Sequence, residues 1–105
     1  MKTLVSVPHH AYPSTVRDSA EAKLQQLAKY FDRIESVRAV LERERGSHRV
    51  EIVIKVGHGA TLVVDSKAET IDLALEDALQ RAKGLLTRHK ERLVKRHRRA
   101  KREED

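Results

Sequence analysis

The residues of this chain that can do chemistry are mostly cations, and they gather in its last quarter. Residues 81–102 contain eleven Lys and Arg against a single acid, Glu91, which gives a net charge of +10. Residues 1–80 contain 11 Lys and Arg and 12 Asp and Glu, which gives a net charge of −1. The excess charge is therefore local, and a local block of positive charge is typical of proteins that bind a polyanion, most often nucleic acid.

Helical spacing places part of this charge on one stripe. At 100° per residue, five of the cations fall within about 60° of one another on a helical wheel. They span about 27 Å of helix at a rise of 1.5 Å per residue, so they could follow a nucleic-acid backbone. A solvated helix face normally mixes charges of both signs, and this one does not. We therefore favour polyanion binding by a basic ridge made of Arg81, Arg88, Arg92, Lys95 and Arg99.

Other residues could add to the basic ridge. Lys23 and Lys29 fall on the first predicted helix, and they line the same groove as the ridge if the two helices lie side by side. Tyr30 can stack on a base or ribose, or equally close the hydrophobic core. His89 falls at the edge of an apolar stripe, where it either packs or contacts a phosphate. Gly84 allows close approach of another backbone or, as we favour, is a tolerated surface glycine.

The sequence offers little for catalysis, for metal binding or for a cofactor. It has no nucleophile elbow, no phosphate-binding glycine loop and no acid/base pair that spacing singles out. The six His residues include no H-E-x-x-H frame, and the chain has no Cys that could complete a zinc site. We expect no catalytic residue, no metal, no cofactor and no small-molecule substrate.

Composition also indicates a compartment. The absence of Cys suits a reducing environment. The N-terminus lacks the apolar region of a signal peptide, and no apolar run approaches the length of a membrane span. We expect a soluble, cytoplasmic protein with no membrane partner. With only two Tyr, one Phe and no Trp, base stacking is a poor fit, so contact with phosphates and recognition of RNA shape fit better.

The hydrophobic pattern predicts the elements that must position these residues. Residues 3–7 form a short β-rich run, and apolar residues then recur at steps of three and four from 16 to 34, which indicates a helix. The period changes to two over residues 37–42, 50–56 and 60–65, which predicts an antiparallel meander. A long second helix follows. Capping boxes are expected at Thr15 with Asp18 and at Ser66 with Glu69.

The predicted order is β-α-β-β-β-α, and each element has one apolar face. The fold class is therefore α+β, a two-layer domain with two helices packed on one face of a four-stranded sheet. We expect this domain to span residues 1–93. Residues 94–105 have no apolar face, so we expect a basic and then acidic C-terminal tail that is frayed or disordered.

One apolar feature of the predicted sheet has two interpretations. Val40, Val53 and Val63 fall on the outward phase of three successive strands. If the strands are in register, these residues form an apolar row on the uncovered face. Such a row is either ordinary cross-strand packing or a contact surface for a partner.

Three short motifs, in the right order and on the right elements, resemble the ribosome hibernation promoting factors, also called ribosome-associated inhibitors. Residues 23–32, K-L-Q-Q-L-A-K-Y-F-D, are similar to the end of that family's first helix. Residues 48–51, H-R-V-E, resemble the start of its third strand. Arg81 together with residues 86–90, L-T-R-H-K, resembles a segment of its second helix. The resemblance covers about residues 1–93 and is to the short forms, which lack the second domain that drives ribosome dimerisation.

The resemblance implies a partner and a mechanism. It implies binding to the small ribosomal subunit in the channel between head and body, where messenger and transfer RNA bind, and silencing of translation in stationary phase or stress. A helper factor for ribosome dimerisation is a further partner that it leaves open. Gln26 and Gly84 stand where the family often has Lys and Arg. Carried over by position, the residues that face ribosomal RNA are Lys23, Lys29, Tyr30, Arg81, Arg88, His89 and Lys90.

Two functions from other classes stay open on the sequence alone. A generic double-stranded RNA- or DNA-binding module without ribosome specificity would have the same α+β frame and basic helix. An interaction protein would use the valine row, with the basic tail as a docking arm. Binding to arbitrary duplexes as tightly as to ribosomal subunits would favour the first of these, and retention of all binding without the tail would show that the tail is accessory.

Overall fold

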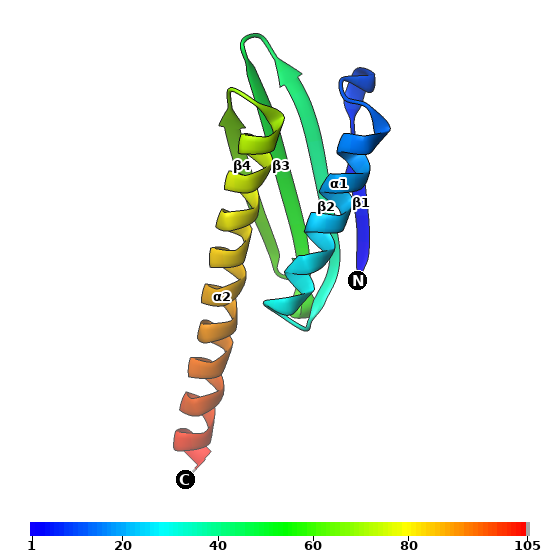
Figure 1. Cartoon of the computed structure of the whole chain (residues 1–105). Helices are drawn as coiled ribbons and strands as arrows, with labels where there is room; N and C mark the ends of the chain where they lie inside the picture. The colour runs from blue at the N-terminus through cyan, green and yellow to red at the C-terminus, as the bar shows by residue number, and fades with distance from the viewer. Residues whose placement is uncertain (105) are drawn as a thin grey trace.

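The order of the elements along the chain is the predicted β-α-β-β-β-α (Figure 1). A computed structural model describes residues 1–104, apart from the side chains of His58 and residues 100–104. Three short 3-10 segments, η1 (Pro8–His10), η2 (Gln26–Lys29) and η3 (Gly57–Gly59), join the main elements. The strands and helices are β1 (Lys2–Ser6), α1 (Ser14–Gln25), β2 (Ile34–Glu44), β3 (Ser47–Val56), β4 (Thr61–Ala68) and α2 (Ile71–Glu104).

The four strands form one sheet in the order β1-β2-β3-β4. β1 pairs parallel with β2, and the other two pairs are antiparallel. A parallel pair needs a crossover connection, which α1 supplies. α1 packs on β1, and α2 packs on β3 and β4, so both helices cover the same face of the sheet (Figure 1). The predicted two-layer α+β architecture is confirmed.

The core lies between the sheet and the helices, and the predicted alternation places the right residues in it. The inward residues of β2 and β3 are almost fully buried, as are three alanines of α2 at four-residue steps. Ala74, Ala78 and Ala82 are small enough to bring the α2 backbone close to the sheet. The largest fully buried side chains are Leu24, Leu27, Val37, Leu41, Val50, Ile52, Ile54, Val56 and Leu86.

The first helix begins where the sequence predicts, near Pro13–Thr15, but the predicted capping box of Thr15 and Asp18 is wrong. α1 begins at Ser14 after Pro13, and no side chain caps its first turn. The Pro13 carbonyl instead accepts hydrogen bonds from the N–H groups of Val16 and Arg17. Proline fixes φ near −65°, so the backbone of Pro13, at φ −67°, begins the helix without help from Thr15. The helix also ends earlier than predicted, since Ile34 is already the first residue of β2.

The second predicted capping box is also wrong. Ser66 lies inside β4, where it is 3% exposed, rather than at the start of α2. The residue that caps α2 is Thr70, whose Oγ1 accepts a hydrogen bond from the N–H of Leu73 at 3.1 Å. Because β4 continues to Ala68, only two residues separate the strand from the helix, and Thr70 stands at the correct position for a cap.

The valine row does not form as a single row. Val53 pairs with Val63, but Val40 lies opposite Glu51, and Val53 pairs with Arg38. The tight turn at Arg45–Gly46 sets this register, and Gly46 adopts the positive φ of 71° that the turn requires. The open face of the sheet therefore has a Val53–Val63 pair, not a three-strand apolar stripe.

α2 is longer than the sheet that it packs on. The molecule measures 57 × 23 × 19 Å along its principal axes, and Figure 1 shows α2 projecting past the sheet. The helix crosses residue 94 without a break and continues to Glu104. The division of the chain at residue 93 and the fraying of its end stay predictions. No helix in the described part of the chain is long and apolar enough to cross a membrane.

Candidate nucleic-acid interface

A polar clamp fixes α2 to β4 at the start of the basic ridge. The buried Ser66 hydroxyl donates to Oδ2 of Asp77 at 2.6 Å. The same Asp77 oxygen lies 3.0 Å from Nε of Arg81, and Nη1 of Arg81 donates to the Asp65 carbonyl at 3.2 Å. These contacts partly neutralise the charge of Arg81 and hold its side chain against the rest of the domain. Its position in the ridge is as predicted, but it is not a free cation.

The next ridge residue along α2 borders a shallow hollow between α2 and β4. Arg88 lines this hollow together with Gly84 and Val63. A Cβ placed on Gly84 would meet only Nη2 of Arg88, at 3.9 Å, which is ordinary van der Waals contact. Packing therefore does not require glycine at this position, and this supports its interpretation as a tolerated surface residue.

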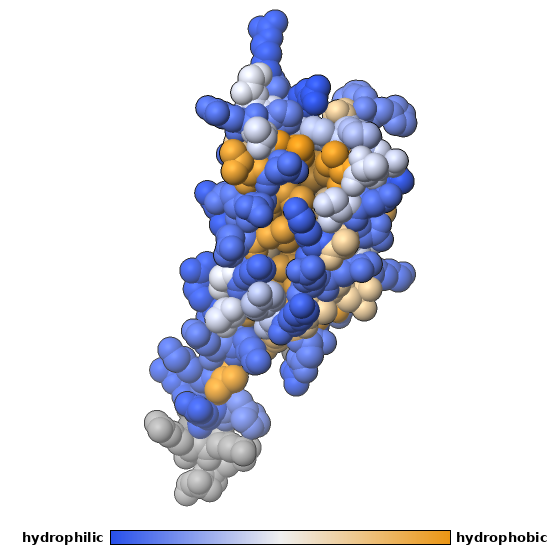
Figure 2. All heavy atoms as spheres, in the orientation of Figure 1, coloured by the Kyte–Doolittle hydropathy of each residue, from blue (hydrophilic) through white to orange (hydrophobic). Residues whose placement is uncertain are grey.

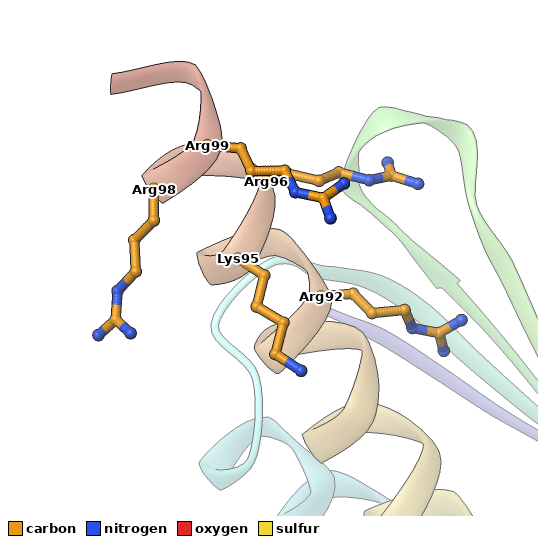
Figure 3. Close-up of a pocket in the computed structure, with 5 residues that line it drawn as sticks. All are labelled: Arg92, Lys95, Arg96, Arg98 and Arg99. Atoms are coloured by element: carbon orange, nitrogen blue, oxygen red, sulfur yellow. The ribbon is translucent and has the colours of Figure 1, made fainter. Parts of the chain in front are cut away.

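The far end of α2 presents five cations around a second hollow, shown in Figure 3. All five side chains are exposed to solvent. Within the described part of the chain, none of them has an ion-pair partner. Two of them, Arg96 and Arg98, are not among the residues predicted for the site. The five residues are Arg92, Lys95, Arg96, Arg98 and Arg99.

The flank of α2 that faces α1 has its own cations. Nζ of Lys83 lies 5.4 Å from the centroid of the Tyr30 ring, a cation–π geometry. Tyr30 is 37% exposed, so its ring lies against Lys83 of α2 while part of it stays open to solvent. Lys90 lines a hollow with Phe31 on the same flank. Lys83 is absent from the predicted site, although it lies seven residues, two helical turns, before Lys90.

His89 is a packing residue in this structure. Its ring meets Phe31 edge-on, with centroids 5.3 Å apart and planes at 85°. Its Nε2 is buried and has no hydrogen-bond partner among the described residues. Of the two roles weighed for His89, this geometry supports packing between α2 and the segment after η2.

The structure does not bring all predicted site residues into one groove. Arg81 and Arg88 lie against β4, whereas Tyr30 lies on the other flank, against Lys83. Lys23 is partly buried on α1 and Lys29 is exposed in η2, so both belong to the α1 side. α2 therefore separates two cationic flanks, and the sharing of one groove by Lys23, Lys29 and the ridge stays a prediction.

The uncovered face of the sheet contains a cluster of acidic residues around Arg49. Nε of Arg49 donates to Oδ1 of Asp65 at 2.9 Å, and Arg49 also forms ion pairs with Glu42 and Glu51. The Arg49 guanidinium holds the pKa of the Asp65 carboxyl below its usual value, chiefly through this hydrogen bond. Three acids surround one Arg, so this cluster is net negative, unlike the two flanks of α2.

The fold and its cationic helix layer define a class, a small α+β domain with a basic C-terminal helix suited to nucleic acid. The chain belongs to the family described as Sigma 54 modulation protein / S30EA ribosomal protein, whose model matches residues 5–94. This confirms the family resemblance of the three motifs.

Named relatives agree with this assignment. The chain is 30% identical over 81 residues to the ribosome hibernation promoting factor of Azotobacter vinelandii, covering 77% of this chain and 75% of that protein. It is 29% identical over 78 residues to the factor of the same name from Escherichia coli K12, covering 74% and 81%.

Solved structures share the fold. A ribosomal subunit interface protein from Coxiella burnetii superposes with a TM-score of 0.77 at 13% identity, covering 86% of this chain and 98% of that one. The N-terminal domain of Protein Y from Thermus thermophilus gives a TM-score of 0.71 at 24% identity, with coverage of 85% and 99%. At these identities the likeness is one of fold alone.

Proposed function

We propose that this protein is a non-enzymatic ribosome hibernation factor of the cytoplasm. It binds the small ribosomal subunit in the decoding channel and blocks messenger and transfer RNA by occupying their space. The observation that carries the proposal is the basic α2 helix on a domain that the S30EA ribosomal protein family matches over residues 5–94. The relatives named ribosome hibernation promoting factor support the same regulation of translation.

The chemistry of the surface suits ribosomal RNA. A-form RNA is recognised mainly through its backbone and shallow groove, which asks for cations rather than aromatic platforms. Figure 2 shows mostly hydrophilic side chains over the projecting part of α2, with one apolar side chain among them, and apolar surface between the two helices. In our proposal the ridge cations contact phosphates on one flank of α2, and Lys23, Lys29 and Lys90 contact phosphates on the other.

Tyr30 and His89 have smaller roles in this proposal. The exposed edge of Tyr30 contacts a ribose or base beside Lys83. His89 positions α2 through its contact with Phe31 rather than through a phosphate. Arg81 contributes to the positive field while its clamp to Asp77 holds the helix in place.

Co-sedimentation with purified small subunits at physiological salt tests the proposal. We expect saturable binding of about one copy per subunit, displaced by excess messenger RNA with initiator transfer RNA. The variant Arg88→Gln/Lys90→Gln/Arg92→Gln should bind at least about tenfold more weakly, because each of these cations neutralises a phosphate in the proposed complex. Arg81 is left unchanged, since its substitution would also loosen the docking of α2.

A matched control removes three cations from the opposite face of the molecule. Lys2, Arg38 and Lys55 lie on the uncovered sheet face, and their replacement by Gln changes the net charge equally. This control should bind as the unmodified protein does. Binding that never saturates, or that ordinary duplex RNA competes away equally well, would refute the hibernation proposal and identify a generic duplex-binding module.

A further inference from the structure

We propose that the end of α2 is a separate RNA-binding arm that lies between two phosphate backbones of duplex RNA. The arm is the part of α2 after residue 94, and Arg92 leads into it. The inference rests on the proposed function and deepens it, since it assigns the last two ridge cations, Lys95 and Arg99, to a second RNA element together with Arg96 and Arg98.

The arm lies outside both the family domain and the hydrophobic core. The family model ends at residue 94, whereas α2 continues to Glu104. Leu93 is the last residue of α2 that packs against the core, and Val94 is already 44% exposed. Residues 95–99 are all exposed. Val94, His97 and Arg98 still border a hollow with residues 31–33, but none of residues 94–99 belongs to the hydrophobic core, so burial of apolar surface does not explain why the chain keeps a helix here.

The charge of the arm favours a partner of opposite sign. The sequence has no acid between Glu91 and Glu103, and Lys95, Arg96, Arg98 and Arg99 fall in that interval. Like charges three or four residues apart destabilise an isolated helix. Residues 92, 95, 96, 98 and 99 form five such pairs. A polyanion relieves this repulsion, because each phosphate neutralises a cation and releases counterions.

The directions of the side chains identify the shape of that polyanion. In Figure 3, Arg92, Arg96 and Arg99 extend to one side of α2, and Arg98 extends to the other. A helix lying along a single strand needs cations on one flank only. Cations on both flanks fit a helix that reaches phosphates of both strands across a groove of an RNA duplex, since duplex RNA is bound through its shape and through phosphates on either side of its grooves.

Other polyanions fit the arm less well. Single-stranded RNA is usually held by aromatic side chains, and the chain has no Phe, Tyr or Trp after Phe31. Arg is more frequent than Lys among the five cations around the hollow, and its planar guanidinium matches phosphate oxygens in pairs. An acidic protein surface would use the same charges, so it is an outcome that the experiment must separate.

The test compares the full chain with an arm variant in a binding assay. The probes are a blunt RNA duplex of arbitrary sequence, a single strand of the same length, poly-glutamate and purified small subunits. The matched control removes four cations from the uncovered sheet face: Lys2→Gln, Arg38→Gln, Lys55→Gln and Lys67→Gln. The arm variant combines Lys95→Gln, Arg96→Gln, Arg98→Gln and Arg99→Gln, and circular dichroism confirms that each variant is folded.

We expect the arm variant to lose duplex binding selectively. The slope of log affinity against log salt should fall by about 3, since each phosphate contact contributes about 0.7 to 0.9. The control should keep the slope of the unmodified chain. Equal slopes for the arm variant and the unmodified chain, or poly-glutamate binding tighter than duplex binding, would overturn the inference.

Single substitutions test the two-sided geometry. Arg98→Gln and Arg96→Gln should weaken duplex binding to a similar extent and reduce the salt slope by about 1 each. If only Arg96→Gln has an effect, the arm contacts one backbone and the proposed geometry is wrong.

Failure of this inference is distinguishable from failure of the proposed function. An arm variant that binds small subunits and duplex RNA as the unmodified chain does would refute the arm and leave the hibernation proposal standing. An unmodified chain that binds duplex RNA through the arm but does not bind small subunits would refute the hibernation proposal and support the arm as a duplex-binding element.

Discussion

Removing the Asp77 carboxylate should loosen α2 from the sheet and destabilise the whole domain. In Asp77→Ala the hydroxyl of Ser66, which is 3% exposed, loses its acceptor, and an unsatisfied buried group costs about 1–3 kcal/mol. The pair with Arg81 is half-exposed, so its loss adds only about 0.2–1 kcal/mol. The expected decrease in unfolding free energy is therefore about 2 kcal/mol, which lowers Tm by roughly 10 °C in a domain of this size.

Urea and thermal unfolding followed by circular dichroism measure this change. Asp77→Asn keeps an oxygen that can accept from Ser66, so it should cost less than about 1 kcal/mol. Glu76→Ala, at the neighbouring exposed position, should change stability by no more than about 0.5 kcal/mol. An Asp77→Ala protein as stable as the Glu76→Ala control would show that apolar contacts alone hold α2 on the sheet.

Three further substitutions test the core, the hairpin contact and the acid cluster. Leu86→Ala, at a fully buried position, should cost about 2–5 kcal/mol in urea unfolding, whereas Leu73→Ala, 55% exposed, should cost less than about 0.5. Tyr12→Phe removes a hydroxyl that donates to the Glu42 carbonyl at 3.1 Å and lies 2.6 Å from Nδ1 of His48, so thermal unfolding should show a loss of about 1 kcal/mol. The lowered pKa of Asp65 contributes stability that is complete above its unfolded pKa of about 3.9 and is lost as pH falls through the lower folded pKa. The stability difference between Asp65→Asn and the unmodified chain should therefore shrink below about pH 4 in a urea series, and a difference independent of pH would contradict this origin.

The fold was predictable because the hydrophobic period changes at the right places. A 3.6-residue period becomes a 2-residue period near Val37, and short turns leave an antiparallel meander as the only economical pairing. The inward set Val50, Ile52, Ile54 and Val56 follows from alternation alone. Patterns of this kind depend on local geometry, which the sequence determines directly.

The capping residues and the strand register were harder to predict, because each depends on contacts distant in sequence. Ser66 has the residue type of a cap, but it pairs with Val50 in the β3–β4 ladder and its hydroxyl donates to Asp77 on α2. Val40 fits an outward valine row by phase, but the turn at Gly46 places it opposite Glu51. Local motifs could not predict either arrangement, since the partner of each residue, Asp77 for Ser66 and Glu51 for Val40, lies on another element.

The candidate site shows the same limit on a larger scale. The helical wheel correctly groups the ridge cations, because it uses only the geometry of one helix. It also places Asp77 one turn before Arg81, but it cannot show that Arg81 donates to the Asp65 carbonyl on β4, or that Lys83 contacts Tyr30 after η2. The sequence therefore predicts which side chains share a stripe, and the packing of α2 decides which of them are free to bind.

In our proposal, the arrangement of α2 lets one helix serve both the fold and an RNA ligand. Its first half is anchored by alanines at four-residue steps and by the Ser66–Asp77–Arg81 clamp, and these contacts use its apolar face and one cation. The helix continues past Leu93, its last residue that packs against the core, and Lys95, Arg96, Arg98 and Arg99 have no ion-pair partner among the described residues. Because α2 is one continuous helix, its rise of about 1.5 Å per residue sets the spacing between the two parts. A ligand that binds both halves must then match the spacing between them, which gives shape selectivity without base contacts.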